Sequence, residues 1–70
     1  MTRLARKRKQ LRLTQTAMAH LIGISQQAYA MHERRGIRNV DMAARYARYL
    51  SCRPEDILEL PRIAEKRWEN

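Results

Sequence analysis

The feature that most constrains the fold is a pair of short helical segments within residues 13–33, separated by a single glycine. Thr14 and Ser25 each precede a run of helix-forming residues, and their hydroxyls are suited to cap a helix N-terminus. Gly23 lies between the two segments, where a left-handed backbone conformation can end a helix at little cost. Ala19 is small enough for two helices to cross closely. The segment therefore predicts two hinged helices.

Apolar residues recur at helical spacing along the chain without an alternating strand pattern, so the expected fold class is all-α. The expected helices span about Arg3–Leu11, Gln15–Ile22, from the Ser25 cap through Glu33, Asp41–Leu50, and a fifth from Pro54 that stops at Pro61, with Arg34–Asn39 as a loop. The residues expected to face inward are Leu4, Arg8, Leu11, Gln15, Met18, Ala19, Ile22, Ile24, Tyr29, Met42, Ala43, Tyr46, Ala47, Leu50, Ile57, Leu58 and Leu60, with His32, Tyr49 and Cys52 as further packing residues. Residues 1–61 are expected to form one domain, followed by a C-terminal tail over residues 62–70.

The net charge of +8 is concentrated in one half of the chain. Residues 1–38 contain nine Lys and Arg and one acid, whereas residues 39–70 contain six of each sign. Clustered positive charge is typical of a surface that binds a polyanion, and here it coincides with the paired helices. The second of these helices starts with Gln26 and Gln27 and has no carboxylate there to repel phosphate. A basic, solvated face without a ligand is the alternative interpretation.

Size and composition narrow the possible functions. Seventy residues give one small domain with a marginal core, so dimerisation is an expected stabilising aid. Cys52 is the one cysteine and the histidines lack zinc spacing, so neither a metal nor another cofactor is expected. No serine has histidine and acid partners and no glycine-rich phosphate loop is present, which argues against an enzyme. Without a long apolar run, we expect a soluble, cytoplasmic protein with no membrane partner.

Several of these residues resemble a known family. Leu13-Thr14-Gln15, Ala19, Gly23-Ile24-Ser25 and Glu33-Arg34 are similar to the helix-turn-helix of lambdoid phage repressors and Cro proteins, the XRE-type group. The resemblance covers about residues 3–60. It implies a five-helix, lambda-repressor-like DNA-binding domain and a phage or prophage repressor that binds a near-palindromic operator in double-stranded DNA as a homodimer. Small relatives pair through the region that corresponds here to Leu50–Pro61.

The resemblance also implies roles for individual residues. Gln26 and Gln27 match base-reading glutamines, because an amide can donate and accept in one plane as the major-groove edge of adenine requires. Ala30 could contact a thymine methyl group. The residues that match phosphate contacts are Thr14, Gln15, Ser25, Arg34, Arg35, Arg38 and Asn39. Gln15 also matches a glutamine that packs against the first base-reading glutamine. Arg8 and Glu33 match an ion pair that ties the first helix to the third.

Departures from the family leave part of the function open. Tyr29 and His32 stand where relatives often have apolar residues, and Met31 replaces a frequent polar base contact, so no operator preference can be copied. Many antitoxins use the same DNA-binding module with an added toxin-binding segment. A DNA-binding antitoxin that autoregulates its operon, with a toxin protein as partner, is therefore the alternative function. In that case the tail, through Ile63 and Trp68, would contact the toxin.

Overall fold

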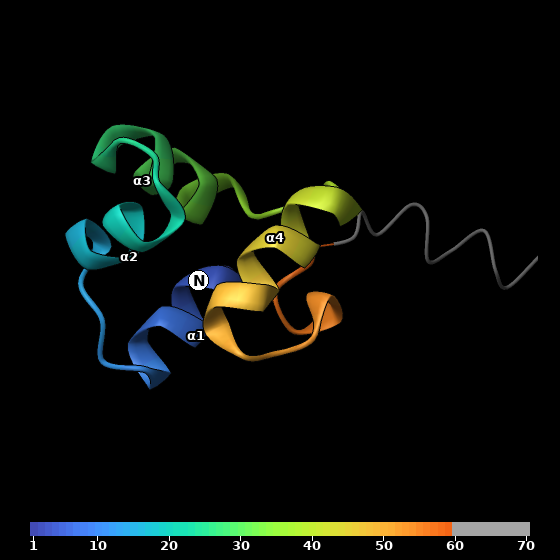
Figure 1. Cartoon of the computed structure of the whole chain (residues 1–70). Helices are drawn as coiled ribbons and strands as arrows, with labels where there is room; N and C mark the ends of the chain where they lie inside the picture. Colours follow the sequence, from blue (N-terminus) through green and yellow to red (C-terminus); the bar gives the residue numbers. More distant parts are fainter. Residues whose placement is uncertain (60–70) are drawn as a thin grey trace, which may run out of the picture.

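The structure, a computed structural model, describes residues 1–59, and most of these residues are helical (Figure 1). They form α1 (Arg3–Gln10), α2 (Gln15–Ile22), α3 (Gln26–Arg35), α4 (Val40–Leu50) and a short 3-10 helix, η1 (Pro54–Asp56). The all-α class is confirmed. The expectations for Leu60, Pro61 and the tail with Ile63 and Trp68 lie outside the described residues.

Each α-helix begins with a side-chain cap, and the caps at Thr14 and Ser25 are the ones that the sequence predicts. The side chains of Thr2, Thr14, Ser25 and Asn39 each accept a hydrogen bond from the backbone N–H three residues later. These bonds satisfy N–H groups that have no partner within the helix. Between α2 and α3, Gly23 adopts φ 86° and ψ 35°, which ends α2 and lets Ser25 begin a new helix. The predicted hinge is therefore confirmed.

The core joins all of these elements around two tyrosine rings. Tyr29 of α3 and Tyr46 of α4 are both almost completely buried, with ring centroids 6.1 Å apart. The other buried apolar residues of the cluster are Leu4, Met18, Ala19, Ile22, Ile37, Ala43, Ala47, Leu50 and Ile57. Figure 1 shows α2 beside α3, with the chain after α4 returning through η1 toward α1. The core thus holds α3 from one side only.

The prediction of a fifth α-helix is wrong, because only a single 3-10 turn forms after Arg53. Pro54 begins η1, and the Asp56 carboxylate accepts a hydrogen bond from the Arg53 backbone N–H. Leu58 then forms a parallel backbone bridge with Ile37, and the Glu59 N–H bonds to the Ile37 carbonyl at 2.6 Å. Pairing with an extended segment requires an extended backbone, so the helix cannot continue past Asp56.

Other boundaries and orientations also differ from expectation. The third helix continues to Arg35, because the Gly36 N–H still bonds to the His32 carbonyl, so Arg34 and Arg35 belong to α3 and not to the loop. α1 stops at Gln10, and Leu11, expected to face inward, is 43% exposed.

On α4, two residues expected to pack are largely open to solvent. Met42 and Tyr49 lie outside the stripe of Ala43, Tyr46, Ala47 and Leu50 that covers the core, and Tyr49 is 49% exposed. α4 also begins one residue earlier than expected, at Val40, because Asn39 provides the cap.

Ser51 and Gly23 both adopt a left-handed backbone conformation, and opposite substitutions at the two positions test the cost of backbone strain. Ser51 ends α4 at φ 53°, a conformation that costs a residue with a Cβ about 1–2 kcal/mol. Ser51→Gly should therefore raise the free energy of unfolding by about 0.5–1 kcal/mol, after allowing for the greater unfolded-state entropy of glycine. Gly23→Ala, where nothing crowds a Cβ, should lower it by about 1–2 kcal/mol. Urea denaturation followed by circular dichroism measures both, and a destabilised Ser51→Gly variant would contradict the assignment.

Candidate nucleic-acid interface

The leading end of α3 is open to solvent. Gln26 and Gln27 occupy its first turn and are both exposed, and no acidic residue lies in that turn. Ser25, which caps α3, and Thr14, which caps α2, are also exposed. The two helix N-termini carry partial positive charge from their backbone N–H groups. This surface therefore combines amide side chains with two sites that favour an anion.

The later turns of α3 are fixed by one buried carboxylate. Glu33 is 8% exposed and accepts four side-chain hydrogen bonds. Arg8 of α1 approaches with two nitrogens, Nε at 2.7 Å from Oε2 and Nη2 at 3.1 Å from Oε1. The Tyr29 hydroxyl donates to Oε2 at 2.6 Å, and the Gln15 amide donates to Oε1 at 3.0 Å. We call these four side chains the Glu33 network.

The Glu33 network determines the charge state of its members. Burial of the Glu33 carboxylate raises its pKa, but the hydrogen bonds from Arg8, Tyr29 and Gln15 together outweigh burial and lower the pKa to about 2. The hydrogen bond to Glu33 raises the pKa of Arg8. Burial, followed by the contact with Glu33, raises the pKa of Tyr29. At neutral pH the network therefore holds an ionised carboxylate, a guanidinium and a neutral phenol.

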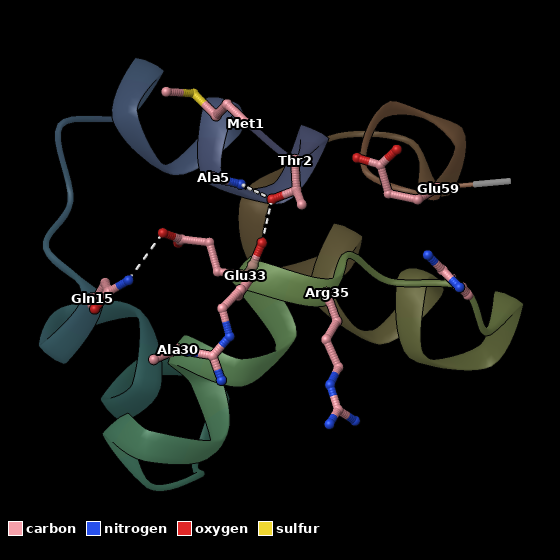
Figure 2. Close-up of a pocket in the computed structure, with 10 residues that line it drawn as sticks. Met1, Thr2, Ala5, Gln15, Ala30, Glu33, Arg35 and Glu59 are labelled. Atoms are coloured by element: carbon pink, nitrogen blue, oxygen red, sulfur yellow. Dashed lines mark hydrogen bonds between the residues drawn. The ribbon is translucent and has the colours of Figure 1, made fainter. Parts of the chain in front are cut away.

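Further bonds extend the Glu33 network to the backbone. Arg8 donates through Nη1 to the Leu13 carbonyl at 2.8 Å, which fixes the connection between α1 and α2. The Thr2 hydroxyl donates to the Glu33 carbonyl while accepting from the Ala5 N–H (Figure 2). Because α1, the α1–α2 connection, α2 and α3 all meet at Glu33, small movements of this carboxylate would tilt α3.

A cationic hollow of about 700 Å³ lies between the start of α1 and the outer end of α3. Its lining residues are Met1, Thr2, Ala5, Gln15, Ala30, Glu33, Arg34, Arg35, Arg38 and Glu59. Figure 2 shows Gln15 pointing to Glu33, and Arg35 extending away from α1. Since the Glu33 charge is balanced by Arg8, the remaining charged residues of the hollow are Arg34, Arg35, Arg38 and Glu59, so positive charge is in excess.

The structure places most of the predicted residues in two groups. Thr14, Ser25, Gln26 and Gln27 are at the helix N-termini, while Arg34, Arg35 and Arg38 surround the hollow at the other end of α3. Ala30 lies between them and is partly buried. The amide nitrogen of Gln15 donates to Glu33. Asn39 uses its carbonyl oxygen to cap α4.

Sequence reasoning missed two contributors to this surface. The Tyr29 hydroxyl joins the Glu33 network from the same helix, and the i, i+4 spacing of Tyr29 and Glu33 was the available signal. Glu59 accepts a hydrogen bond from the Arg3 backbone N–H and packs over Gly36, where an added Cβ would lie 2.6 Å from its Cγ. No local sequence signal indicates that second contact, because it joins residues far apart in the chain.

Comparison with known proteins identifies one family. The model of the helix-turn-helix family matches residues 4–57, which is most of the chain and includes α1 through η1. The XRE-type members of this family are DNA-binding regulators, generally without enzymatic activity. Searches of curated proteins and of solved structures give no match. Within residues 1–59, no helix is long and apolar enough to cross a membrane.

The lowered pKa of Glu33 predicts how stability depends on pH. Because its pKa is about 2 when folded and about 4.5 otherwise, Glu33 contributes stability above about pH 4.5 that is lost as the pH falls toward 2. Arg8→Met should lower the free energy of unfolding at pH 7 by about 3 kcal/mol and flatten this acid dependence, since it leaves the buried carboxylate without its cation. Urea denaturation between pH 2 and pH 7 measures both effects.

Arg6→Met provides the matched control, since Arg6 is an exposed arginine on the same helix. We expect it to change the free energy of unfolding by less than about 0.5 kcal/mol at every pH. Equal effects of the two substitutions would remove the ion pair from the account of stability.

Proposed function

Because the chain belongs to the XRE-type helix-turn-helix family of DNA-binding transcription regulators, we propose that it is a Cro-like repressor that binds a near-palindromic operator as a homodimer. In this proposal α3 enters the major groove with its first turn foremost, and residues 1–61 form the DNA-binding domain. The chain then represses transcription by occupying its operator.

The observation that carries this proposal is the exposure of Gln26 and Gln27 at the front of a rigidly held helix. The major groove is about 12 Å wide and admits one α-helix, so residues of the first turn can reach base edges. A glutamine amide offers one donor and one acceptor, which match the N6 and N7 atoms of adenine. We therefore assign base contacts to Gln26 and Gln27, with Ala30 offering a methyl contact to thymine.

Phosphate contacts would bracket α3 at both ends. Thr14, Gln15 and Ser25 lie at or next to helix N-termini, where backbone N–H groups favour an anion. Arg34, Arg35 and Arg38 offer cations at the far end of α3, where Gln15 lines the same hollow, and Asn39 follows them in the connection to α4. Contacts at both ends would hold the axis of α3 at a fixed angle in the groove, which base reading requires.

Dimer formation through the segment from Leu50 toward Pro61 completes the proposal. Two copies would place their α3 helices in successive major grooves, about 34 Å apart on one side of the duplex. Selection of bound sites from random duplexes reports half-site symmetry and spacing together. A selected site without two-fold symmetry, or sedimentation of a monomer on DNA, would exclude the dimer.

Single glutamine substitutions test base reading. Gln26→Ala or Gln27→Ala should weaken binding to the selected operator by about 1–3 kcal/mol while leaving binding to unrelated duplexes nearly unchanged. Gln10→Ala, on the exposed surface of α1, is the matched control and should leave both affinities as they are. Electrophoretic mobility shift or fluorescence anisotropy at one fixed salt concentration measures these affinities. Uniform weakening on every duplex would contradict the assigned base contacts.

Salt dependence tests the phosphate contacts. Operator affinity should fall steeply with salt concentration, because each neutralised phosphate releases counterions. Arg35→Gln should reduce the slope of log affinity against log salt by about 1, since one phosphate contact is lost. Arg48→Gln removes an exposed charge from α4, apart from the hollow, and should keep the wild-type slope. If both variants changed the slope equally, net charge rather than position would account for binding.

A further inference from the structure

Tyr29 has a place in the Glu33 network that neither the family resemblance nor the proposed contacts explain. Its side chain is fully buried, and its hydroxyl lies 2.6 Å from Glu33 Oε2. The same oxygen accepts from Arg8 Nε, while the other oxygen accepts from Arg8 Nη2 and Gln15. Tyr29 is thus the one member of the network that approaches Glu33 from within α3.

The geometry gives this hydroxyl a specific consequence. A carboxylate with two partners on each oxygen has its rotation blocked from both sides, whereas loss of one partner leaves Oε2 attached only to the long, flexible side chain of Arg8. Hydrogen bonds to an ionised acceptor are about twice as strong as neutral ones, so the phenol is an effective restraint. Because Glu33 also fixes the Gln15 amide at the start of α2, its position sets how α2 and α3 meet.

We propose that Tyr29 is a positioning residue for DNA sequence discrimination, because its hydroxyl fixes the Glu33 carboxylate and thereby the angle at which α3 presents Gln26 and Gln27. This inference rests on the proposed function. Tyr29 touches no DNA in this arrangement, since it is fully buried. Its effect is therefore on the ratio of operator affinity to nonspecific affinity, and not on affinity for duplex DNA in general.

Tyr46 provides a matched control for removal of the Tyr29 hydroxyl. Tyr46 is equally buried, packs against the Tyr29 ring, and has its hydroxyl 3.0 Å from His32 Nδ1 rather than near Glu33. Tyr29→Phe and Tyr46→Phe each remove one buried hydroxyl and keep the ring. A role for the core alone predicts similar effects from both substitutions, whereas positioning through Glu33 predicts an effect from Tyr29 only.

The experiment compares operator and scrambled duplex binding for the wild type and the two variants at one salt concentration. Tyr29→Phe should reduce the affinity ratio by about tenfold, with scrambled-duplex affinity unchanged, and Tyr46→Phe should stay within about twofold of the wild type. Titration of the Glu33 carboxyl carbon by nuclear magnetic resonance provides a readout that needs no DNA. The pKa of Glu33 should rise in Tyr29→Phe and remain at its wild-type value in Tyr46→Phe, because of the two tyrosines only Tyr29 donates a hydrogen bond to Glu33.

Each contrary result has a distinct meaning. An unchanged affinity ratio in Tyr29→Phe, or an equal loss in Tyr46→Phe, would overturn the positioning role while the proposed function stands. A wild-type chain that prefers no duplex would overturn both, even if the Glu33 titration behaved as expected. If Tyr29→Phe fails to fold, the comparison is repeated for all three chains with sucrose in the buffer, because an osmolyte excluded from the protein surface favours the compact state without altering the sequence.

Discussion

The arrangement of the first three helices depends on a single buried carboxylate. Glu33 alone joins Arg8 of α1, Gln15 of α2 and Tyr29 of its own helix, and its backbone carbonyl receives the Thr2 hydroxyl. In a core of this size, apolar contacts fix which faces meet but leave helices free to slide and tilt by small amounts. Directional hydrogen bonds to one charged acceptor remove that freedom. Each carboxylate oxygen already accepts two hydrogen bonds, so Glu33 favours this one arrangement of the three helices.

This constraint separates two tasks along α3. Tyr29 and Glu33, in the later turns, point into the interior, whereas the exposed side chains of Gln26 and Gln27, in the first turn, make no hydrogen bond within residues 1–59. A buried ion pair contributes little net stability relative to apolar packing, because desolvation of the charges offsets most of their attraction. Its value here is orientation. Substitutions at Gln26 and Gln27 can therefore change what the helix contacts without disturbing how the helix is held.

Sequence reasoning succeeds where the information is local and fails where it depends on distant partners. The caps at Thr14 and Ser25, the left-handed Gly23 and the bounds of α2 follow from neighbouring residues, and all are observed. The ion pair of Arg8 with Glu33, which the resemblance implies, is also present. The fifth helix was wrong because Ile37 pairs with Leu58, a contact across the fold that overrides the helical tendency after Pro54. The exposure of Leu11 and Met42 likewise depends on where neighbouring elements end, which periodicity alone does not specify.

The placement of charge limits what the net value of +8 can mean for binding. On α1, Arg8 forms an ion pair with Glu33. The cations Arg3, Arg6 and Lys7 line a different hollow, which is also lined by the acids Glu55 and Asp56. Acids beside these cations reduce the local potential there. Charges farther than about 8 Å from a phosphate are largely screened at physiological salt, so they attract DNA at a distance only in dilute buffer. In the proposed complex, direct contacts would instead be made by the arginines near the outer end of α3, Arg34, Arg35 and Arg38. In that complex, net charge would govern the rate of encounter at low salt, whereas the strength of the bound state would follow from the few cations at the end of α3 and in the turn after it.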